Sequence, residues 1–500
     1  MSEDAGGDRS VGSVSLARTL VRQAERAMVR SADAVLIRGN RARVLTESAV
    51  ALDAWIEAIT RANDWVHLEN YIIRDDRTGR YFRDLLAEKA RSGVRVRVLY
   101  DWLGCWATPN SFWRPMRAAG VDVRSFSPPR VTEPLRIFHR DHRKVVAVDG
   151  WYASVGGMCI GDEWAGDPES GIPAWRDTGV EISGPAAAVV DRAFARSWRE
   201  AGPMLPLDEI PDPHAIPAEG NVSIRVVEGE PGRSRIYRLS QFVSVGVEKR
   251  LWITDPYFVT PPAMTEALAA AARDGVDVRV LVPAYNNWPV VGGFSRAGYR
   301  SLLEAGVRIF EWEGPMIHAK TAVADGVWTR VGSSNLNLAS LMSNWELDLA
   351  ILDLSVGRVM EDLFVQDLAS AVEIRLPPPE AERGRRTLVR KSINESPVRS
   401  PESSVGAARE ARRRARRGSP IGRVLGRISR ASIVLSRSLL GQRNVALEDR
   451  GWIVAIAVLL LALSLVGFIF PRLFAWPAAF GVFWVGIASI YRAFSRSQSD

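Results

Sequence analysis

The chain has 500 residues, of which 47% are hydrophobic and 24% are charged, and its formal net charge is +8. This length allows two or three domains with sizeable cores. The two cysteines, Cys105 and Cys159, are too few for a disulfide framework, so the body is expected in a reducing compartment. The first ten residues, MSEDAGGDRS, are acidic and polar and are unlike a secretory signal peptide.

The elements predicted along the chain begin with an amphipathic helical segment at residues 1–37. Residues 38–378 then alternate helical stretches, such as Arg80–Ser92, with β-branched runs, such as Val94–Leu99 and Leu251–Ile253. This order predicts an α/β fold in which a mixed sheet is flanked by helices.

A short pattern, His-x-Lys-x4-Asp-Gly, occurs twice in this part of the chain, in FHRDHRKVVAVDG and again in MIHAKTAVADG. The residues of the two copies are His142, Lys144 and Asp149, and then His318, Lys320 and Asp325. One copy alone would fit a strand that carries a surface His and Lys before a glycine turn. The chain holds only five His and five Lys against sixty Arg, so a chance repeat is improbable and a paired functional role is favoured.

The similarity between the two parts extends beyond this pattern. RSGVRVRVLYD (Arg91–Asp101) resembles RDGVDVRVLVP (Arg273–Pro283), and ENYII has a looser partner in DPYFV. Two repeats of this size indicate a duplicated domain, because a solenoid would show more and shorter units. We therefore expect two halves related by a pseudo-twofold axis, residues 38–205 and 206–378.

The C-terminal part has a different composition. Residues 379–450 are rich in Pro, Ser and Arg and are expected to be a largely disordered basic linker with one surface-lying amphipathic helix. Two charge-free apolar stretches follow, Trp452–Phe470 and Leu473–Ile490, each about long enough to cross a bilayer core of roughly 30 Å. A pair of buried soluble helices is the alternative. Arginines before and after the two stretches favour a transmembrane hairpin at residues 451–491 with a cytoplasmic tail at 492–500.

The positive charge lies beside this predicted anchor. Eighteen Arg or Lys and six acids give residues 381–450 a net charge of +12, whereas residues 1–380 carry −6. A nucleic-acid enzyme normally places its positive charge around the active site, so no nucleic-acid partner is expected. The linker is instead suited to anionic lipid headgroups, at about 1 kcal/mol per nearby Arg. We expect a protein of the inner cell membrane whose catalytic body faces the cytoplasm.

The paired segments HRKVVAVDG…GG and HAKTAVADG…GSSN resemble the two signature motifs of the phospholipase D superfamily, over roughly residues 38–378. HLENYIIRDDRTGRYF, VLYDWLG, WRDTGVEISGP and GSSNLNLASLMSNWELDLAI resemble its cardiolipin synthase branch. Most long bacterial members of that branch carry their hairpin before the catalytic body, whereas here it follows.

Phosphodiester chemistry explains why two histidines are needed. One imidazole attacks phosphorus and forms a covalent phosphohistidine, while a second imidazole on the opposite side protonates the leaving oxygen. The second imidazole then takes a proton from the incoming hydroxyl. Lys144 and Lys320 would hold the phosphoryl oxygens in place of a metal, and the resemblance implies neither a metal nor a cofactor. It also implies that His142 is the nucleophile and His318 the proton-transfer group.

Supporting residues follow from the same motifs. Ser333 and Asn335 of GSSN can donate hydrogen bonds to the phosphoryl group, whereas the first copy has Gly157 and Cys159 at the corresponding positions. By resemblance, Glu346 in NWELD orients a catalytic histidine. Asp177 in WRDTG is its expected counterpart, and Glu69 in ENYII is a further expected site residue. Asp149 and Asp325 have two open roles, in catalysis or as clamps of a strand turn. His67 and His214 have no motif around them and are expected to be structural or exposed.

The resemblance implies transfer of a phosphatidyl group from one phosphatidylglycerol to another, which makes cardiolipin and releases glycerol. Two other functions remain open. A membrane-bound hydrolase of phospholipid, or less favourably of nucleic acid, would use the same residues with water as the acceptor. An inactive scaffold that binds anionic lipid is disfavoured by the two intact His/Lys pairs.

Overall fold

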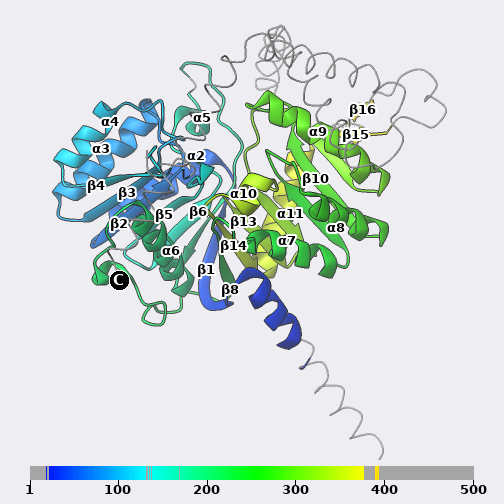
Figure 1. Ribbon diagram of the computed structural model, residues 1–500, viewed down its shortest axis with the longest axis horizontal. Coiled ribbons are helices and arrows are strands. Elements are labelled where there is room, and N and C mark those ends of the chain that lie inside the picture. The colour runs from blue at the N-terminus through cyan, green and yellow to red at the C-terminus, as the bar shows by residue number, and fades with distance from the viewer. Residues whose placement is uncertain are drawn as a thin grey trace, which may run out of the picture. The chain divides into compact units, whose positions relative to one another are not determined.

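The computed structural model (Figure 1) describes residue 19, residues 22–376 apart from 131, 132, 134, 135, 137 and 168, and residues 389–392. The predicted hairpin at 451–491 and tail at 492–500 lie outside these residues, as does the linker at 379–450 except for one short strand. Within the described part of the chain, no helix is both long and apolar enough to cross a membrane.

The strands and helices alternate as the sequence predicts. The strands of the first half are β1 (Ile37–Leu45), β2 (Trp65–Asn70), β3 (Arg95–Asp101), β4 (Asp122–Phe126), β5 (Lys144–Val148), β6 (Tyr152–Gly156) and β7 (Gly179–Ser183), and the second half begins with β8 (Val222–Gly229). Those that follow are β9 (Arg250–Thr254), β10 (Asp277–Pro283), β11 (Arg308–Trp312), β12 (Thr321–Ala324), β13 (Trp328–Gly332), β14 (Glu346–Leu352), β15 (Ala371–Arg375) and β16 (Val389–Ser392).

Helices occupy most of the connections between these strands. They are α2 (Ser48–Arg61), α3 (Arg77–Arg91), α4 (Asn110–Ala118), α5 (Asp162–Ala165), α6 (Pro185–Ala201), the 3-10 helix η2 (Leu207–Glu209), α7 (Arg235–Gly246), α8 (Pro262–Arg273), α9 (Pro289–Glu304), α10 (Leu338–Met342) and α11 (Leu354–Leu368). The predicted N-terminal amphipathic segment is helical at residues 22–32 of its described part.

One sheet joins the described strands, and its order repeats. Outward from the central antiparallel pair β1–β8, one side runs β7-β6-β5-β2-β3-β4 and the other runs β14-β13-β12-β9-β10-β11, followed by β15 and β16. In each half three strands are parallel and the rest antiparallel. The strands fan out from β1 and β8 in Figure 1. This repeated order is what a duplicated domain predicts, and the mixed sheet flanked by helices confirms the α/β class.

The repeat fixes where the two motifs lie. Lys144 opens β5 and pairs with Asn70 at the end of β2, and Thr321 opens β12 and pairs with Thr254 at the end of β9. Because equivalent strands begin at equivalent places, both His/Lys pairs lie at the edge where β2 and β9 end. We call this edge of the sheet the motif edge.

Local sequence accounts for several helix starts. Asp76 precedes α3, and its carboxylate accepts a hydrogen bond from the Gly79 backbone N–H at 2.8 Å. Asp353 does the same for α11, accepting from the N–H groups of Ser355 and Val356. Such caps stabilise a helix by about 1 kcal/mol. The helix α6 buries Ala and Val side chains, and α11 buries Val356, Met360 and Leu363, in one apolar cluster with strand residues of both halves.

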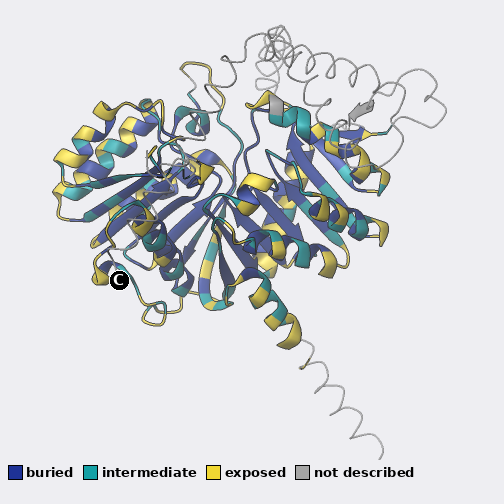
Figure 2. Cartoon of the chain, in the orientation of Figure 1, coloured by how far each residue is buried: buried dark blue, intermediate teal, exposed yellow. Residues whose placement is uncertain are grey.

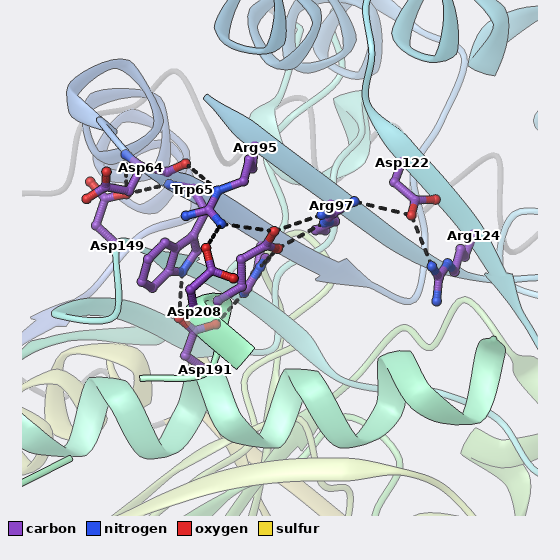
Figure 3. Close-up of polar contacts among 11 residues, drawn as sticks. Asp64, Trp65, Arg95, Arg97, Asp122, Arg124, Asp149, Asp191 and Asp208 are labelled. Atoms are coloured by element: carbon purple, nitrogen blue, oxygen red, sulfur yellow. Dashed lines mark hydrogen bonds and ion pairs between the residues drawn. The ribbon is translucent and has the colours of Figure 1, made fainter. Parts of the chain in front are cut away.

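Ion pairs hold η2, in the connection between the halves, at the edge of the sheet opposite the motif edge (Figure 3). Arg95 Nη1 lies 2.5 Å from Asp208, and Arg97 Nη2 lies 2.8 Å from Glu209, so β3 holds η2 in place. Trp65 Nε1 donates to Asp191 Oδ2 of α6 at 2.8 Å. This edge is therefore fixed by ion pairs between elements distant in sequence.

Two segments, residues 127–139 and residues 285–300 with most of α9, group apart from the unit that contains the sheet. Within 285–300, Asn286 Oδ1 accepts a hydrogen bond from the Trp288 N–H at 2.8 Å, just before α9 begins.

Candidate active site

The two motif histidines are each held by backbone from the other half. The His142 N–H donates to the Trp345 carbonyl at 2.9 Å, and the His318 N–H donates to the Arg176 carbonyl at 2.7 Å. His142 is 8% exposed and His318 is 4% exposed. The crossed contacts bring both halves into one site, which neither half could form alone.

Each histidine also takes its carboxylate partner from the other half. His142 Nδ1 lies 3.0 Å from both carboxylate oxygens of Glu346, and His318 Nδ1 lies 2.8 Å from Asp177 Oδ2. An ionised carboxylate only accepts hydrogen bonds, so the ring proton lies on Nδ1 in both cases. The Nε2 lone pair of each ring is thereby left free for chemistry.

The carboxylates are fixed in turn by the sequence around them. Ser333 Oγ donates to Glu346 Oε2 at 2.5 Å, and the Thr178 N–H donates to Asp177 Oδ1 at 2.8 Å. Burial would raise the pKa of Glu346, but the facing His142 and Lys144 hold it below its usual value. His318 and Lys320 lower the pKa of Asp177 in the same way. Both acids are therefore charged and can orient their imidazoles.

The surroundings of the two motif histidines favour their neutral forms. Burial lowers the pKa of His142, and Glu346 offsets only part of this effect. Burial together with Lys320 lowers the pKa of His318 to about 3, despite the nearby Asp177. Neutral imidazoles with a free Nε2 can act as nucleophiles at neutral pH.

The two lysines lie beside the histidines in equivalent surroundings. Lys144 and Lys320 are fully buried, and their Nζ atoms donate to the carbonyls of His142 and His318, respectively. Burial lowers the pKa of Lys144, and it lowers that of Lys320 to about 8. Neither lysine has a carboxylate at ion-pair distance among the described residues, so the two buried ammonium groups can hold an anionic phosphoryl group.

Two tyrosines belong to the site and were not predicted. The Tyr71 ring lies 4.9 Å from the His142 ring and 5.0 Å from Lys144 Nζ, and the Tyr257 ring lies 5.8 Å from both His318 and Lys320 Nζ. Their rings stabilise the ammonium groups through cation–π contacts. They occupy matching places in ENYII and DPYFV, so the internal repeat carried a signal that could have found them.

The residues at the positions expected to bind the phosphoryl group have different surroundings in the two halves. Asn335 is 4% exposed, its Nδ2 lies 3.4 Å from Ser340 Oγ, and its Oδ1 has no hydrogen-bond partner in the described chain. Ser333 serves Glu346 instead. In the first half, a side chain at Gly157 would place its Cβ 2.4 Å from Asp177 Oδ1, so glycine is required there. Cys159 follows, buried at 1% exposure.

Asp149 and Asp325 lie at the far ends of β5 and β12, about 16 Å along the strand from their lysines. The Asp149 carboxylate accepts hydrogen bonds from the backbone N–H groups of residues 63–65, and the Asp325 carboxylate accepts them from residues 248–250. Both have positive φ, 51° and 53°, as a tight turn requires. These contacts support the clamp role for both residues and do not support the catalytic role, which the sequence had left open for them.

Glu69 lies inside the first half rather than at the histidines. It is fully buried, and its neighbours are Asp141, Arg143 and Ser197 rather than either motif histidine. Burial raises its pKa, and burial together with Glu69 raises that of Asp141. The expected role in substrate binding is therefore not supported by its position.

Comparison with known proteins places the chain in a family. Residues 246–368 match a family model described as the phospholipase D-like domain of cardiolipin synthase. The chain is 34% identical over 351 residues to cardiolipin synthase A of Pseudomonas putida, covering 70% of this chain and 72% of that one. It is 34% identical over 337 residues to a cardiolipin synthase of Geobacillus thermodenitrificans, covering 66% of each chain.

A solved structure shares the fold. The phosphatidylserine synthase of Haemophilus influenzae superposes with a TM-score of 0.55 at 14% sequence identity, covering 79% of this chain and 97% of that one. At that identity the likeness concerns the fold alone. The relatives in sequence confirm the resemblance read from the paired motifs. The chain belongs to the phospholipase D superfamily, in its cardiolipin synthase branch.

Proposed function

We propose that this protein is a phosphatidyltransferase that makes cardiolipin from two molecules of phosphatidylglycerol and releases glycerol. The observation that carries the proposal is the crossed pairing of two histidines with carboxylates, which leaves two Nε2 atoms free beside two buried lysines. The naming of the relatives as cardiolipin synthases supports the choice of substrate.

In the first step, the Nε2 of His142 attacks phosphorus and the bond from phosphorus to the glycerol oxygen breaks. His318 donates its Nε2 proton to that oxygen, so glycerol leaves neutral. Lys144 and Lys320 hold the non-bridging oxygens as charge builds on them. A bound phosphodiester anion offsets the lysine charges, so it raises the pKa of His318 and lets this residue carry the proton.

In the second step, His318 removes a proton from the primary hydroxyl of another phosphatidylglycerol. The resulting oxygen attacks phosphorus, the bond between phosphorus and His142 breaks, and Nε2 of His142 regains its electron pair. While the histidine is phosphorylated its ring is cationic, and the carboxylate of Glu346 at Nδ1 stabilises that charge. Asp177 does the same for His318 whenever it is protonated.

The proposed location is the inner cell membrane, with the catalytic body on the cytoplasmic side. The support comes from sequence outside the described residues: two charge-free apolar stretches at 452–470 and 473–490, and the basic stretch before them. Tethering would hold the site near both lipid substrates at high local concentration.

A hydrolase is the second candidate, because water could accept the phosphatidyl group in the same site. Product analysis separates the two functions. Purified full-length protein is incubated with labelled phosphatidylglycerol in lipid vesicles, with and without added glycerol, and the lipids are identified by mass spectrometry.

Transfer predicts cardiolipin as the main product and its suppression by glycerol, because released glycerol reverses the first step. His142→Ala serves as the inactive control. Phosphatidic acid as the main product, unaffected by glycerol, would show a hydrolase and contradict the proposal.

A further inference from the structure

Two segments at the motif edge carry exposed apolar side chains. Residues 102–113 follow β3 and contain Trp106, 74% exposed, and Leu103, 41% exposed. Residues 333–345 follow β13 and contain Leu338, 63% exposed, and Met342, 38% exposed, both in α10. Exposed positions of α10 appear in yellow in Figure 2.

Both segments are built onto the active site. In the first, Thr108 Oγ1 donates to the carbonyl of Ile73 at 2.5 Å, beside Tyr71, whose ring lies 4.9 Å from His142. In the second, Asn337 Nδ2 donates to the carbonyl of Tyr257 at 3.3 Å, and the Tyr257 ring lies 5.8 Å from His318. The two segments that carry the exposed side chains therefore contact the segments of Tyr71 and Tyr257, which border the two histidines.

The composition of these segments is unusual for this chain. WLGCWATPNSFW at 102–113 and SSNLNLASLMSNW at 333–345 contain no charged residue, whereas 24% of the whole chain is charged. At the opposite edge the most exposed apolar side chains stand among charges. Leu207, 85% exposed, is followed by Asp208 and Glu209, and Val245, 82% exposed, comes shortly before Glu248 and Lys249. Of the segments compared, only the two at the motif edge combine exposed apolar side chains with a sequence free of charged residues.

We propose that residues 102–113 and 333–345 form a rim that docks on a lipid bilayer, with Trp106, Leu338 and Met342 in its interfacial layer. Tryptophan is suited to that layer because its ring is apolar and its N–H is polar. A charge-free rim can leave water without an ionic desolvation cost. The inference rests on the proposed function, since a lipid phosphodiester at the bilayer surface would then face the two histidines directly. The apolar stretches at 452–490 are the reason to choose a bilayer over a protein partner.

The test uses full-length protein with a polarity-sensitive dye attached to one introduced cysteine. The rim variants are Trp106→Cys and Leu338→Cys. The matched controls at the opposite edge are Leu207→Cys and Val245→Cys. The native cysteines are buried, at 3% and 1% exposure, and unlabelled wild type checks that they do not react. Each protein is reconstituted in phosphatidylglycerol vesicles, with and without lipids brominated near the headgroup. We expect blue-shifted emission and quenching by bromine at 106 and 338, and neither at 207 and 245.

Three results would contradict the proposal that the rim docks on a bilayer. No quenching at 106 and 338 would place them in water. Equal quenching at all four sites would mean that the body lies on the bilayer without a preferred face. A blue shift without quenching would mean that protein, such as a second copy of the chain, covers the rim.

An activity measurement separates this inference from the proposed function. The double variant Trp106→Ser, Leu338→Ser should lose about tenfold in turnover on intact vesicles, while turnover of dissolved short-chain phosphatidylglycerol stays within about twofold. Equal loss on both substrates would mean that these residues act through the site and would overturn the rim. If wild type transfers neither substrate, the proposed function fails, and the quenching experiment still decides the docking.

Discussion

His67 and His318 are both buried imidazoles beside carboxylates, yet their pKa values are shifted in opposite directions. His67, in β2, has Nδ1 2.5 Å from Asp191 and Nε2 3.4 Å from Glu209. Burial opposes its protonation, but the two acids raise its pKa above the usual value. His318 has one acid, Asp177, and two lysines nearby, and its pKa falls to about 3.

The difference shows what marks a catalytic histidine in this chain. Both ring nitrogens of His67 are engaged with carboxylates, and its ring stacks on Phe194 at 4.5 Å, so it has no free electron pair. His318 and His142 each keep Nε2 free and have a lysine beside them. Burial and a carboxylate partner are shared by all three residues, whereas the free ring nitrogen and the lysine two positions along the chain belong only to His142 and His318.

Loss of a catalytic histidine should give the largest effect. His142→Ala and His318→Ala should each lower turnover of phosphatidylglycerol at least about 10⁴-fold, because each removes a group that forms or breaks a bond. Thermal denaturation of the detergent-solubilised protein should change little. Turnover within tenfold of wild type in either variant would remove that residue from the mechanism.

Neutralising the carboxylates that face the two histidines should give the second-largest loss of turnover. Glu346→Gln and Asp177→Asn should lower turnover by about 10²- to 10⁴-fold, because the amide cannot stabilise a cationic ring. The pH profile gives a second readout that a purely structural role would not move. Without the negative charge the pKa of the facing histidine falls, so the limb that this histidine sets should move to lower pH. In Glu346→Gln this is the acidic limb, because His142 attacks as a neutral ring, and in Asp177→Asn it is the alkaline limb, because His318 donates a proton. An unchanged limb would contradict the orienting role.

His67 should show the opposite behaviour. His67→Ala removes one partner from each of two buried acids, Asp191 and Glu209, so it should lower the free energy of unfolding by about 3 kcal/mol. Turnover at a temperature where the protein stays folded should remain within about twofold of wild type. A loss of activity without a loss of stability would make His67 part of the site.

The pH dependence of stability should have opposite signs at the two places. The folded pKa of His67 is raised, so its contribution is complete below about pH 6.5 and is lost as pH rises through the folded pKa. The folded pKa of His318 is lowered, so its contribution is present above about pH 6.5 and is lost as pH falls toward 3. Denaturation midpoints of wild type, His67→Gln and His318→Gln across pH test both signs.

Cys159→Asn should give the smallest effect. It restores an amide donor at the position that matches Asn335, and one added hydrogen bond to the phosphoryl group should raise kcat/KM by about two- to tenfold. The measurement is initial-rate kinetics with vesicle substrate. A lower kcat/KM would mean that the first half-site is packed around the thiol.

Sequence patterns predicted much of this site. The repeated His-x-Lys pattern located both pairs at equivalent strand starts, and resemblance to the family selected Glu346 and Asp177. The crossed partnership of the halves was not predicted, because it depends on which strand of one half passes the motif of the other. Asp149 and Asp325 remained open for the same reason, since the backbone groups that they accept lie about 80 residues away.

Trapping the covalent intermediate tests the central claim most directly. His318→Ala is mixed with a nitrophenyl phosphodiester, whose low-pKa leaving group needs no proton, and peptides are examined by mass spectrometry. The mechanism predicts an acid-labile adduct on His142, because the intermediate forms but cannot be resolved. An adduct on His318 in the reciprocal His142→Ala protein, with none on His142, would reverse the roles. The absence of an adduct on either histidine would contradict the mechanism.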